Sequence, residues 1–470
     1  MTDVQIPDIF EGTVIKRGDV NYESECYQNA SSSYMKEDII RPMAIIKAAN
    51  DDDVIQAIKY ASKNKIAVAV RTGGHQYSGA SSTNGKNIQL DLSQTYKDFQ
   101  WDNEDCTSVI FGISFSLNDF NAKLREEDRF VPHGQCSQVN IGGHIQTGGY
   151  GQLARSFGLL SDHVEKFRII TANCQTQWVS RNDDLFFAVL GGSPGNFGVL
   201  THINPNVFRD QDYPNSRGFR AICPYNRDSL KGLLDIMVGM AEDDEFPADY
   251  NYCVSVIDDP RFPTSSELTY DQRYNKKKVF VQQEVTWTRI IIIFVQWANL
   301  EGSQQKYNSD FVDKIRKAAG ISDYNAKQLV QVSDKHYTPM SKLTGDWIVP
   351  MERAFNLPYF KRAYSSNSSS ERLKEFNWTE WVCDRIDKKD TIRICPYQHN
   401  FSILVAPNRD FSKTERKVSR LSVGETLALS GRGVGSSDAI FCEDDRRFLW
   451  GSHDLDLSAA QKYYYDRYPK

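Results

Sequence analysis

Hydrophobic residues in the first third of the chain recur in patterns that predict a β-α-β unit. Val54, Ile58 and Ala61 recur at helical spacing behind three aspartates, which favour the start of a helix. The run Ile66–Val70 that follows is wholly apolar and short, as a buried strand is. It leads directly into the glycine turn Arg71–Gly74, and α/β sheets carry their ligands at such strand ends. We therefore expect a ligand-binding loop there.

The pattern changes at about Phe208, which indicates a second domain. Before this point, glycine-rich loops separate short apolar segments. After it, helices are expected at 228–241 and 308–319, and β-rich segments at 279–287 and 290–297. Within the first part, residues 142–151 (GGHIQTGGYG) contain so much glycine that we expect neither a normal helix nor a normal strand.

Together these segments predict an α+β protein with two domains, of which the second is built on an antiparallel sheet. We place the first domain in residues 1–207 and the second in residues 208–398, with residues 399–470 returning to the first. A chain of 470 residues suits two or three hydrophobic cores, at about 150 residues for each domain.

Composition is that of an ordinary globular protein and narrows the set of partners. The chain is 40% apolar and 25% charged with a net charge of −5, so no nucleic-acid surface is indicated. Its longest apolar run, Ile290–Val295, is too short to cross a membrane. The nine cysteines show no zinc spacing, so no metal is expected. No leader is visible, which predicts a cytoplasmic protein, or a secreted one whose leader has been removed; a monomer is the default.

Two glycine-rich motifs carry the candidate chemistry. Residues 71–79 (RTGGHQYSG) offer the imidazole of His75, and residues 133–151 (HGQCSQVNIGGHIQTGGYG) offer the thiol of Cys136. Both side chains are nucleophiles that can bond to an electrophilic cofactor. The glycines let backbone N–H groups approach a phosphate. A third glycine-rich loop, residues 191–198 (GGSPGNFG), follows an expected capped helix.

These three motifs, in this order, resemble the berberine-bridge-enzyme-like branch of the vanillyl-alcohol-oxidase family, whose fold has a PCMH-type FAD-binding domain. The likeness covers about residues 41–201 and returns in two short patches near the C-terminus. It implies FAD held by two covalent bonds, from His75 and from Cys136 to two carbons of the isoalloxazine. The other FAD-binding positions that the motifs imply are Arg71, Thr72, Gly73, Gly74, Gln76, Tyr77, Ser78, Gly79, Val139, Gly142, Gly143, His144, Gly148, Gly149, Tyr150, Gly198 and Val199.

Two positions just after Cys136 bear on the reaction with oxygen. In the resembling family, the position of Val139 lines the approach of oxygen to the flavin, and valine there goes with oxidases. The resemblance thus implies an oxidase that uses molecular oxygen and releases hydrogen peroxide. The alternative is that Val139 belongs only to the core. Asn140 replaces the glycine more usual in the family, and its side chain could narrow the pocket.

The catalytic base is less well indicated, because the C-terminal patches depart from the family. His399 matches a family histidine, whereas the family's tyrosine position falls on Ser452, next to His453. The family's other base is a carboxylate on a strand. Glu380 is a candidate because flanking tryptophans could raise its pKa by desolvation, and Glu284 is a second. An ion-paired or surface role for Glu380 is an equal alternative.

The resemblance implies hydride transfer from a small-molecule substrate to the flavin. We expect a sugar or another alcohol that is oxidised at a hydroxyl-bearing carbon, since tryptophans in the second domain could stack on it. An oxidase or oxidative cyclase of a phenolic, alkaloid or polyketide metabolite is the alternative. A flavin-binding protein with impaired turnover is the third hypothesis, because the family's tyrosine is replaced.

Overall fold

The computed structural model describes most of the first half of the chain and parts of the second. The described residues are 6–26, 41–76, 81–134, 136–149, 151–192, 195–243, 245–258, 289–304, 306–322, 331–335, 339–346, 359–366, 377–388, 399–405, 425–432, 439–442 and 447–450. The chain divides into two compact units. The first comprises residues 1–212, 339–358 and 411–420, and the second comprises 213–338, 359–410 and 421–470.

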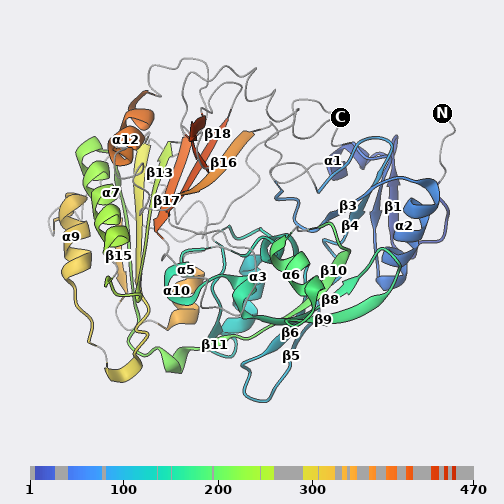
Figure 1. Cartoon of the computed structure of the whole chain (residues 1–470), viewed down its shortest axis with the longest axis horizontal. Coiled ribbons are helices and arrows are strands. Elements are labelled where there is room, and N and C mark those ends of the chain that lie inside the picture. Colours follow the sequence, from blue (N-terminus) through green and yellow to red (C-terminus); the bar gives the residue numbers. More distant parts are fainter. Residues whose placement is uncertain are drawn as a thin grey trace. The chain divides into compact units, whose positions relative to one another are not determined.

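The first unit begins with a small mixed sheet of four strands, in the order β1-β2-β4-β3. β1 (Thr13–Lys16) is antiparallel to β2 (Ala44–Lys47), whereas β2 and β3 (Val68–Arg71) each run parallel to β4 (Ile88–Asp91). The helix α2 (Asp51–Asn64) connects β2 to β3 (Figure 1). It starts where Asn50 accepts a hydrogen bond from the backbone of Asp53 at 3.0 Å. The predicted β-α-β unit is therefore confirmed.

A second, antiparallel sheet of five strands completes the framework of this unit, in the order β5-β6-β10-β8-β9. Its strands are β5 (Phe99–Trp101), β6 (Val109–Gly112), β10 (Val199–Pro205), β8 (Val164–Ile170) and β9 (Thr176–Ser180). The main helices after β6 are α3 (Leu117–Arg125) and α4 (Ile141–Gln146). The other elements are α1 (Tyr22–Cys26), α5 (Ala154–Phe157), α6 (Asp184–Phe187), α10 (Met340–Asp346), the pair β7 (Arg129–Phe130) and β11 (Phe208–Arg209), and helical turns at 160–163, 188–192 and 210–212.

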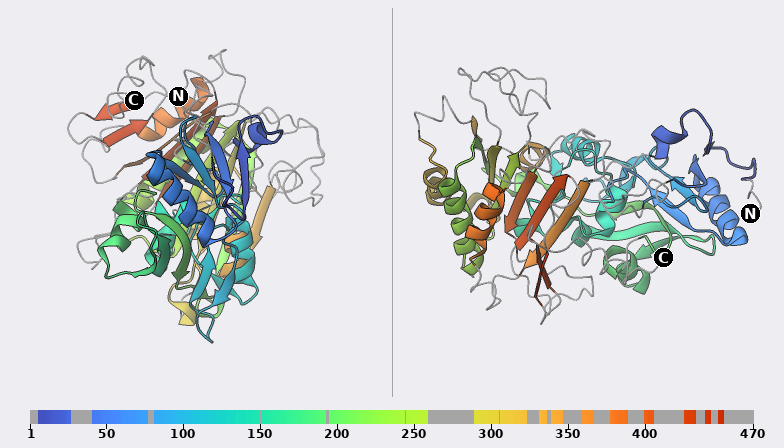
Figure 2. Two further views of the ribbon diagram at one scale, coloured as in Figure 1. Left: turned by 90° about the vertical axis from the view of Figure 1, so that its right-hand side faces the viewer. Right: turned by 90° about the horizontal axis from the view of Figure 1, so that it is seen from above.

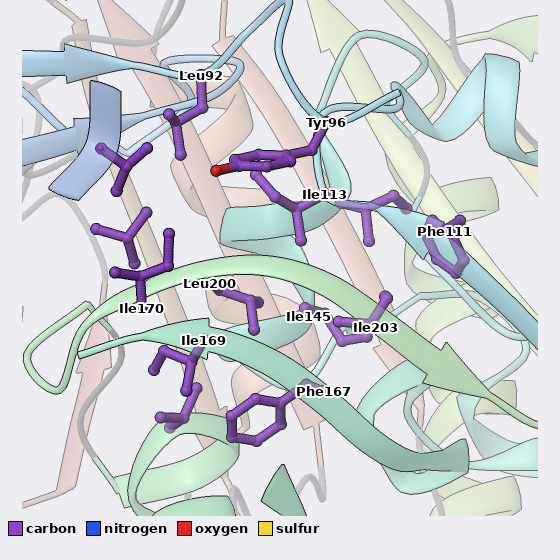
Figure 3. Close-up of a cluster of buried hydrophobic side chains, with 14 of the residues drawn as sticks. Leu92, Tyr96, Phe111, Ile113, Ile145, Phe167, Ile169, Ile170, Leu200 and Ile203 are labelled. Atoms are coloured by element: carbon purple, nitrogen blue, oxygen red, sulfur yellow. The ribbon is translucent and has the colours of Figure 1, made fainter. Parts of the chain in front are cut away.

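One hydrophobic core joins the two sheets and the short helix α4. It contains Leu90 of the first sheet, Phe167 and Ile203 of the second, and Ile145 of α4, all of them buried. Figure 3 shows Ile145, Ile203 and Phe167 among the buried side chains of this core. Because Ile145 is anchored in the core, the adjacent His144 is held at a defined place at its edge.

The helix α4 corrects one expectation from the sequence. Five of its six residues, those at 142–146, fall in the segment for which glycine content predicted neither helix nor strand. Two backbone hydrogen bonds to the segment after β6 hold its first turn: Ile141 donates to Phe115 and Gly142 donates to Ile113, each at 2.9 Å. These tertiary contacts compensate for the low helix propensity of glycine, which is about 1 kcal/mol below that of alanine.

The second unit is built on a fully antiparallel sheet of seven strands in the order β15-β12-β14-β13-β17-β18-β16. The strands are β12 (Arg217–Pro224), β13 (Tyr250–Asp258), β14 (Arg289–Trp297), β15 (Gln331–Lys335), β16 (Tyr359–Ser366), β17 (His399–Val405) and β18 (Glu425–Arg432). A separate pair is formed by β19 (Ala439–Cys442) and β20 (Arg447–Trp450). The expected strand at 290–297 is confirmed as β14, whereas the one at 279–287 lies outside the described residues.

Helices cover one face of this large sheet. α7 (Arg227–Glu242) packs on β13 and β17, and α9 (Asp310–Ala318) and α12 (Trp378–Lys388) pack beside α7 (Figure 1). The right-hand view of Figure 2 shows the three helices on the same face. α7 and α9 confirm the helices expected at 228–241 and 308–319. No helix in the described part of the chain is long and apolar enough to span a membrane.

Candidate cofactor-binding site

The His75 loop leaves the first sheet at the carboxyl end of β3, where a ligand loop was expected. Gly74 has a φ of +67°, a left-handed conformation that glycine adopts at little cost. Thr72, Gly73 and His75 are half-buried, and Gln76 is exposed. The described part of the loop therefore begins in the sheet and reaches the surface at Gln76. Tyr77, Ser78 and Gly79 lie outside the described residues.

A buried ion pair anchors the start of this loop. Arg71 donates from Nε to Asp91 Oδ2 on β4 at 2.9 Å, and its Nη2 contacts the same oxygen. Its Nη1 also donates to the carbonyl of Glu25 at 2.8 Å. Only 7% of the Arg71 side chain and 3% of the Asp91 side chain are exposed. The described contacts of Arg71, one of the predicted FAD-binding residues, are thus those of a structural anchor.

The Cys136 loop runs from β7 to α4 and is held by three backbone hydrogen bonds, two of which come from the first residues of α3. Val139 donates to the carbonyl of Cys136 at 3.1 Å, and Leu117 donates to the carbonyl of Val139 at 2.9 Å. Asn118 donates to the carbonyl of Ser137 at 3.1 Å. Cys136 is half-buried, and Val139 is half-buried against the core. A half-buried thiol on a loop with this many backbone bonds has a defined position and some access to a ligand.

Two histidines clamp Gly134, two residues before Cys136. His133 Nδ1 lies 2.7 Å from the Gly134 carbonyl, and the Gly134 N–H donates to His144 Nε2 at 2.9 Å. A carbonyl only accepts and an N–H only donates, so the proton of His133 is on Nδ1 and that of neutral His144 is on Nδ1 as well. His133 Nε2 is then a bare acceptor. It is buried and has no partner among the described residues.

The surroundings keep both rings neutral. Burial lowers the pKa of His133 to about 4, against the opposing effect of its bond to Gly134. Burial lowers the pKa of His144 to about 3, and the nearby charges of His133 and His75 add to this effect. The His75 loop approaches the start of α4, because a Cβ atom on Gly73 would lie 2.8 Å from Oδ1 of Asn140, the residue directly before this helix. The structure thus brings the two sequence motifs together.

Gly149 and Gly151, which follow α4 in the same motif, are each packed closely against a neighbouring residue. Gly149 has a φ of +73°, and a Cβ atom there would lie 2.5 Å from Cβ of Leu160. A Cβ atom on Gly151 would lie 1.7 Å from the carbonyl oxygen of His133. No side chain fits at either position. Tyr150, between them, lies outside the described residues.

Three buried side chains around this loop carry polar atoms that have no partner within the described structure. They are His133 at Nε2, Gln152 at both amide atoms and Ser161 at Oγ. Buried polar atoms are nearly always hydrogen-bonded, so a group that can both donate and accept is expected here. The hydroxyls and ring amide of FAD meet this requirement. Sequence reasoning missed Gln152 and Ser161; the available signal was polar residues in an otherwise apolar or glycine-rich stretch.

The remaining predicted FAD-binding positions lie on α4 and at the start of β10. Gly142 packs against Ile113, and Gly143 faces open space, with no atom within 4 Å of a Cβ built there. Gly148 is buried, and Gly198 precedes Val199, the first residue of β10. Gly195, in the third glycine loop, donates to Gln146 of α4 at 3.1 Å. The third motif therefore also contacts α4. The contacts of all these residues with FAD stay predictions.

Two of the candidate bases, Glu380 and His399, lie in the described part of the second unit. Glu380 was expected on a strand but lies in the first turn of helix α12, where it forms an ion pair with Arg227. The same guanidinium binds Asp384 at 2.6 Å and Asp387 at 2.5 Å. The contacts of Glu380 are therefore those of the ion-paired role, which the sequence analysis gave as the alternative to a catalytic base. His399 is the first residue of β17, and His453 and Glu284 lie outside the described residues.

Comparison with known proteins identifies the region that contains both glycine-rich motifs as similar to an FAD binding domain. Residues 42–180 match the family model described as an FAD binding domain. An uncharacterized FAD-linked oxidoreductase of Bacillus subtilis is 32% identical over 200 residues, which are 42% of this chain and 43% of that protein. Berberine bridge enzyme-like 12 of Arabidopsis thaliana is 34% identical over 165 residues, 34% of this chain and 31% of that protein. The match thus spans less than half the length of these curated relatives.

Solved structures extend the likeness to most of the fold. Physcomitrella patens BBE-like 1 matches with a TM-score of 0.61 at 14% identity, over 90% of this chain and 82% of that one. 6-Hydroxy-D-nicotine oxidase from Arthrobacter nicotinovorans matches with a TM-score of 0.63 at 17% identity, over 90% and 81%. The expected fold class is confirmed. The chain thus has the fold of these berberine-bridge-enzyme-like and nicotine-oxidase structures, and its residues 42–180 match an FAD binding domain.

Proposed function

We propose that the protein is an FAD-linked oxidase whose FAD is attached through both His75 and Cys136. The observation that carries this proposal is the convergence of the two motifs on α4. Gly73, two residues before His75, packs on Asn140 at the start of α4, and Gly134, two residues before Cys136, donates to His144 of the same helix. A nucleophilic imidazole and a nucleophilic thiol would then border one site.

Each linkage has a simple balance of atoms and electrons. One C–H bond of the flavin and one N–H or S–H bond of the protein would be replaced by a C–N or C–S bond. The two electrons and two protons released each time would reduce molecular oxygen to hydrogen peroxide. Oxygen, the acceptor that we propose for turnover, therefore also serves as the oxidant for attachment.

The protein's own groups would hold FAD by complementary hydrogen bonds. His144 would donate from Nδ1, since its Nε2 is occupied by Gly134. His133 Nε2, Gln152 and Ser161 would pair with hydroxyl or amide groups of the ligand. The open space at Gly143 leaves room for the ligand against α4.

The reaction that we propose is oxidation of a sugar or another alcohol at a hydroxyl-bearing carbon. Bound FAD supplies a two-electron acceptor for the substrate hydride, and oxygen then takes up the electrons as hydrogen peroxide. A base of the protein would remove the hydroxyl proton. His399 is the first candidate to test, because Glu380 is already ion-paired with Arg227.

Peroxide release on two substrate panels tests this function. We expect peroxide with members of a panel of sugars and simple alcohols, and none without substrate. Peroxide only with phenolic or alkaloid substrates would move the assignment to an oxidase or cyclase of such metabolites. Dithionite reduction of bound flavin without turnover on either panel would identify a flavin-binding protein and contradict the proposed activity.

A further inference from the structure

Asn140 occupies a position between the two proposed attachment loops. It lies four residues after Cys136 and directly before α4. An asparagine at the start of a helix commonly accepts a hydrogen bond from the first turn. The side chain of Asn140 makes no such bond. Instead, its Nδ2 donates to the carbonyl of Ser114 at 3.0 Å, and its backbone forms a bridge with Ser116. The amide group is therefore directed away from the helix.

The other side of this amide group packs on the His75 loop. A Cβ atom on Gly73 would lie 2.8 Å from Asn140 Oδ1, its nearest neighbour, and 3.1 Å from both the Cγ and the backbone N of Asn140. Such distances leave no space between the Gly73 backbone and the Asn140 side chain. Gly73 is two residues before His75. The Asn140 amide thus fills the gap between the fixed Ser114 segment and the loop that carries His75.

We propose that Asn140 is a positioning residue that sets the His75 loop for bond formation with the flavin. This inference rests on the proposed attachment of FAD through His75 and Cys136. A glycine at position 140 would leave the Gly73 backbone without this support and let the loop shift toward Ser114. Bond formation is sensitive to such shifts, since a displacement of about 1 Å can slow a reaction about a hundredfold.

The support acts on one loop only. The three backbone bonds that hold the Cys136 loop, at Val139, Leu117 and Asn118, do not involve the side chain of Asn140. Removing that side chain should therefore affect the linkage at His75 and leave the linkage at Cys136 intact. A general loss of folding would reduce both linkages together.

The test compares flavin-linked peptides from the full-length Asn140→Gly variant and the wild-type protein. After proteolysis, mass spectrometry gives the linked fraction at His75 and at Cys136 at a series of times after FAD is added to apoprotein. We expect the rate of linkage at His75 to fall by about tenfold to a hundredfold, with the rate at Cys136 unchanged. Asn118→Ala, an exposed asparagine beside the same loop, is the matched control and should leave both rates unchanged.

A second pair of variants tests the packing contact itself. Gly73→Ala would push its new methyl group against Asn140, so it should slow the His75 linkage and lower the unfolding temperature of the apoprotein. In the Asn140→Gly background, the same substitution should cost less, because the closest obstructing atom, Oδ1 at 2.8 Å, is gone and only the backbone N of residue 140, at 3.1 Å, remains. Equal effects in both backgrounds, or equal slowing at His75 and Cys136, would overturn the role of Asn140. A wild-type protein with no flavin-linked peptide would instead overturn the attachment on which the role rests.

Discussion

Two of the arginine ion pairs in this protein, one in each unit, differ in how deeply they are buried. Arg71 and Asp91, in the first unit, are almost fully covered and hold the start of the His75 loop. Arg227, in the second unit, binds Glu380, Asp384 and Asp387 at the surface, with 33% of its side chain exposed. A buried pair leaves an uncompensated charge when one partner is lost, whereas water replaces an exposed partner. The same chemistry is therefore structural in one unit and nearly dispensable in the other.

The largest effect is expected from Asp91→Ala. Without its partner, the Arg71 guanidinium would remain buried and unpaired, and the free energy of unfolding should fall by about 3–5 kcal/mol. Urea unfolding of the apoprotein measures this change. A loss below about 1 kcal/mol would show that the pair behaves like an exposed one.

A change of pH should act on the histidine clamp in the same unit. The folded pKa values of His133 and His144, about 4 and about 3, lie below the unfolded value of 6.5, so the unfolded chain binds more protons in this range. Stability is therefore present above pH 6.5 and is lost as the pH falls toward 3. Between pH 7 and pH 5, the protonation of each ring in the unfolded chain should lower the free energy of unfolding by about 2 kcal/mol.

The variant His133→Gln removes the contribution of His133 to this pH dependence, because glutamine does not titrate. Urea unfolding at pH 7 and at pH 5 should show a smaller loss in the free energy of unfolding for this variant than for the wild type. An unchanged loss would mean that His133 is not kept neutral by the fold.

Gly149→Ala should have a smaller effect than these. The new Cβ would meet Leu160 at 2.5 Å in a left-handed backbone conformation, which should cost about 1–3 kcal/mol. Gly143→Ala is the matched control, since its Cβ would meet no atom and would favour the helix. Thermal unfolding of the apoproteins should lower the melting temperature only for Gly149→Ala; equal shifts would contradict the close packing at Gly149.

The smallest effect is expected from Glu380→Gln. Its carboxylate is 38% exposed, so loss of its pair with Arg227 should cost at most about 1 kcal/mol. Turnover should also remain close to that of the wild type, because Glu380 is not the proposed base. A loss of turnover by orders of magnitude with unchanged stability would restore Glu380 as the base.

The sequence predicted the parts of the site that depend on local pattern. The apolar run before Arg71 predicted β3 and the loop that follows it, and the motif around Cys136 predicted the second loop. It missed α4, because the backbone bonds of Ile141 and Gly142 come from a segment about thirty residues away. Likewise, nothing local shows that Arg71 binds Asp91, a partner on the adjacent parallel strand.

The helix that carries Glu380 had a signal that the resemblance obscured. The buried residues of α12, Thr379, Val382, Cys383 and Ile386, recur at i, i+3, i+4 and i+7, a spacing typical of a helix and not of the strand that the family likeness suggested. Residue spacing was the better guide there. The roles of His399 and His453 stay predictions, as do the domain boundaries at 207 and 398.

The mass of the acid-denatured protein tests double attachment most directly. The wild type should keep its yellow colour and exceed the mass of its sequence by one FAD, less the hydrogens lost in two linkages. His75→Ala and Cys136→Ala should each retain FAD through the remaining bond, and the double variant should release it. A wild-type protein of unmodified mass, with all its flavin in the supernatant, would contradict the account.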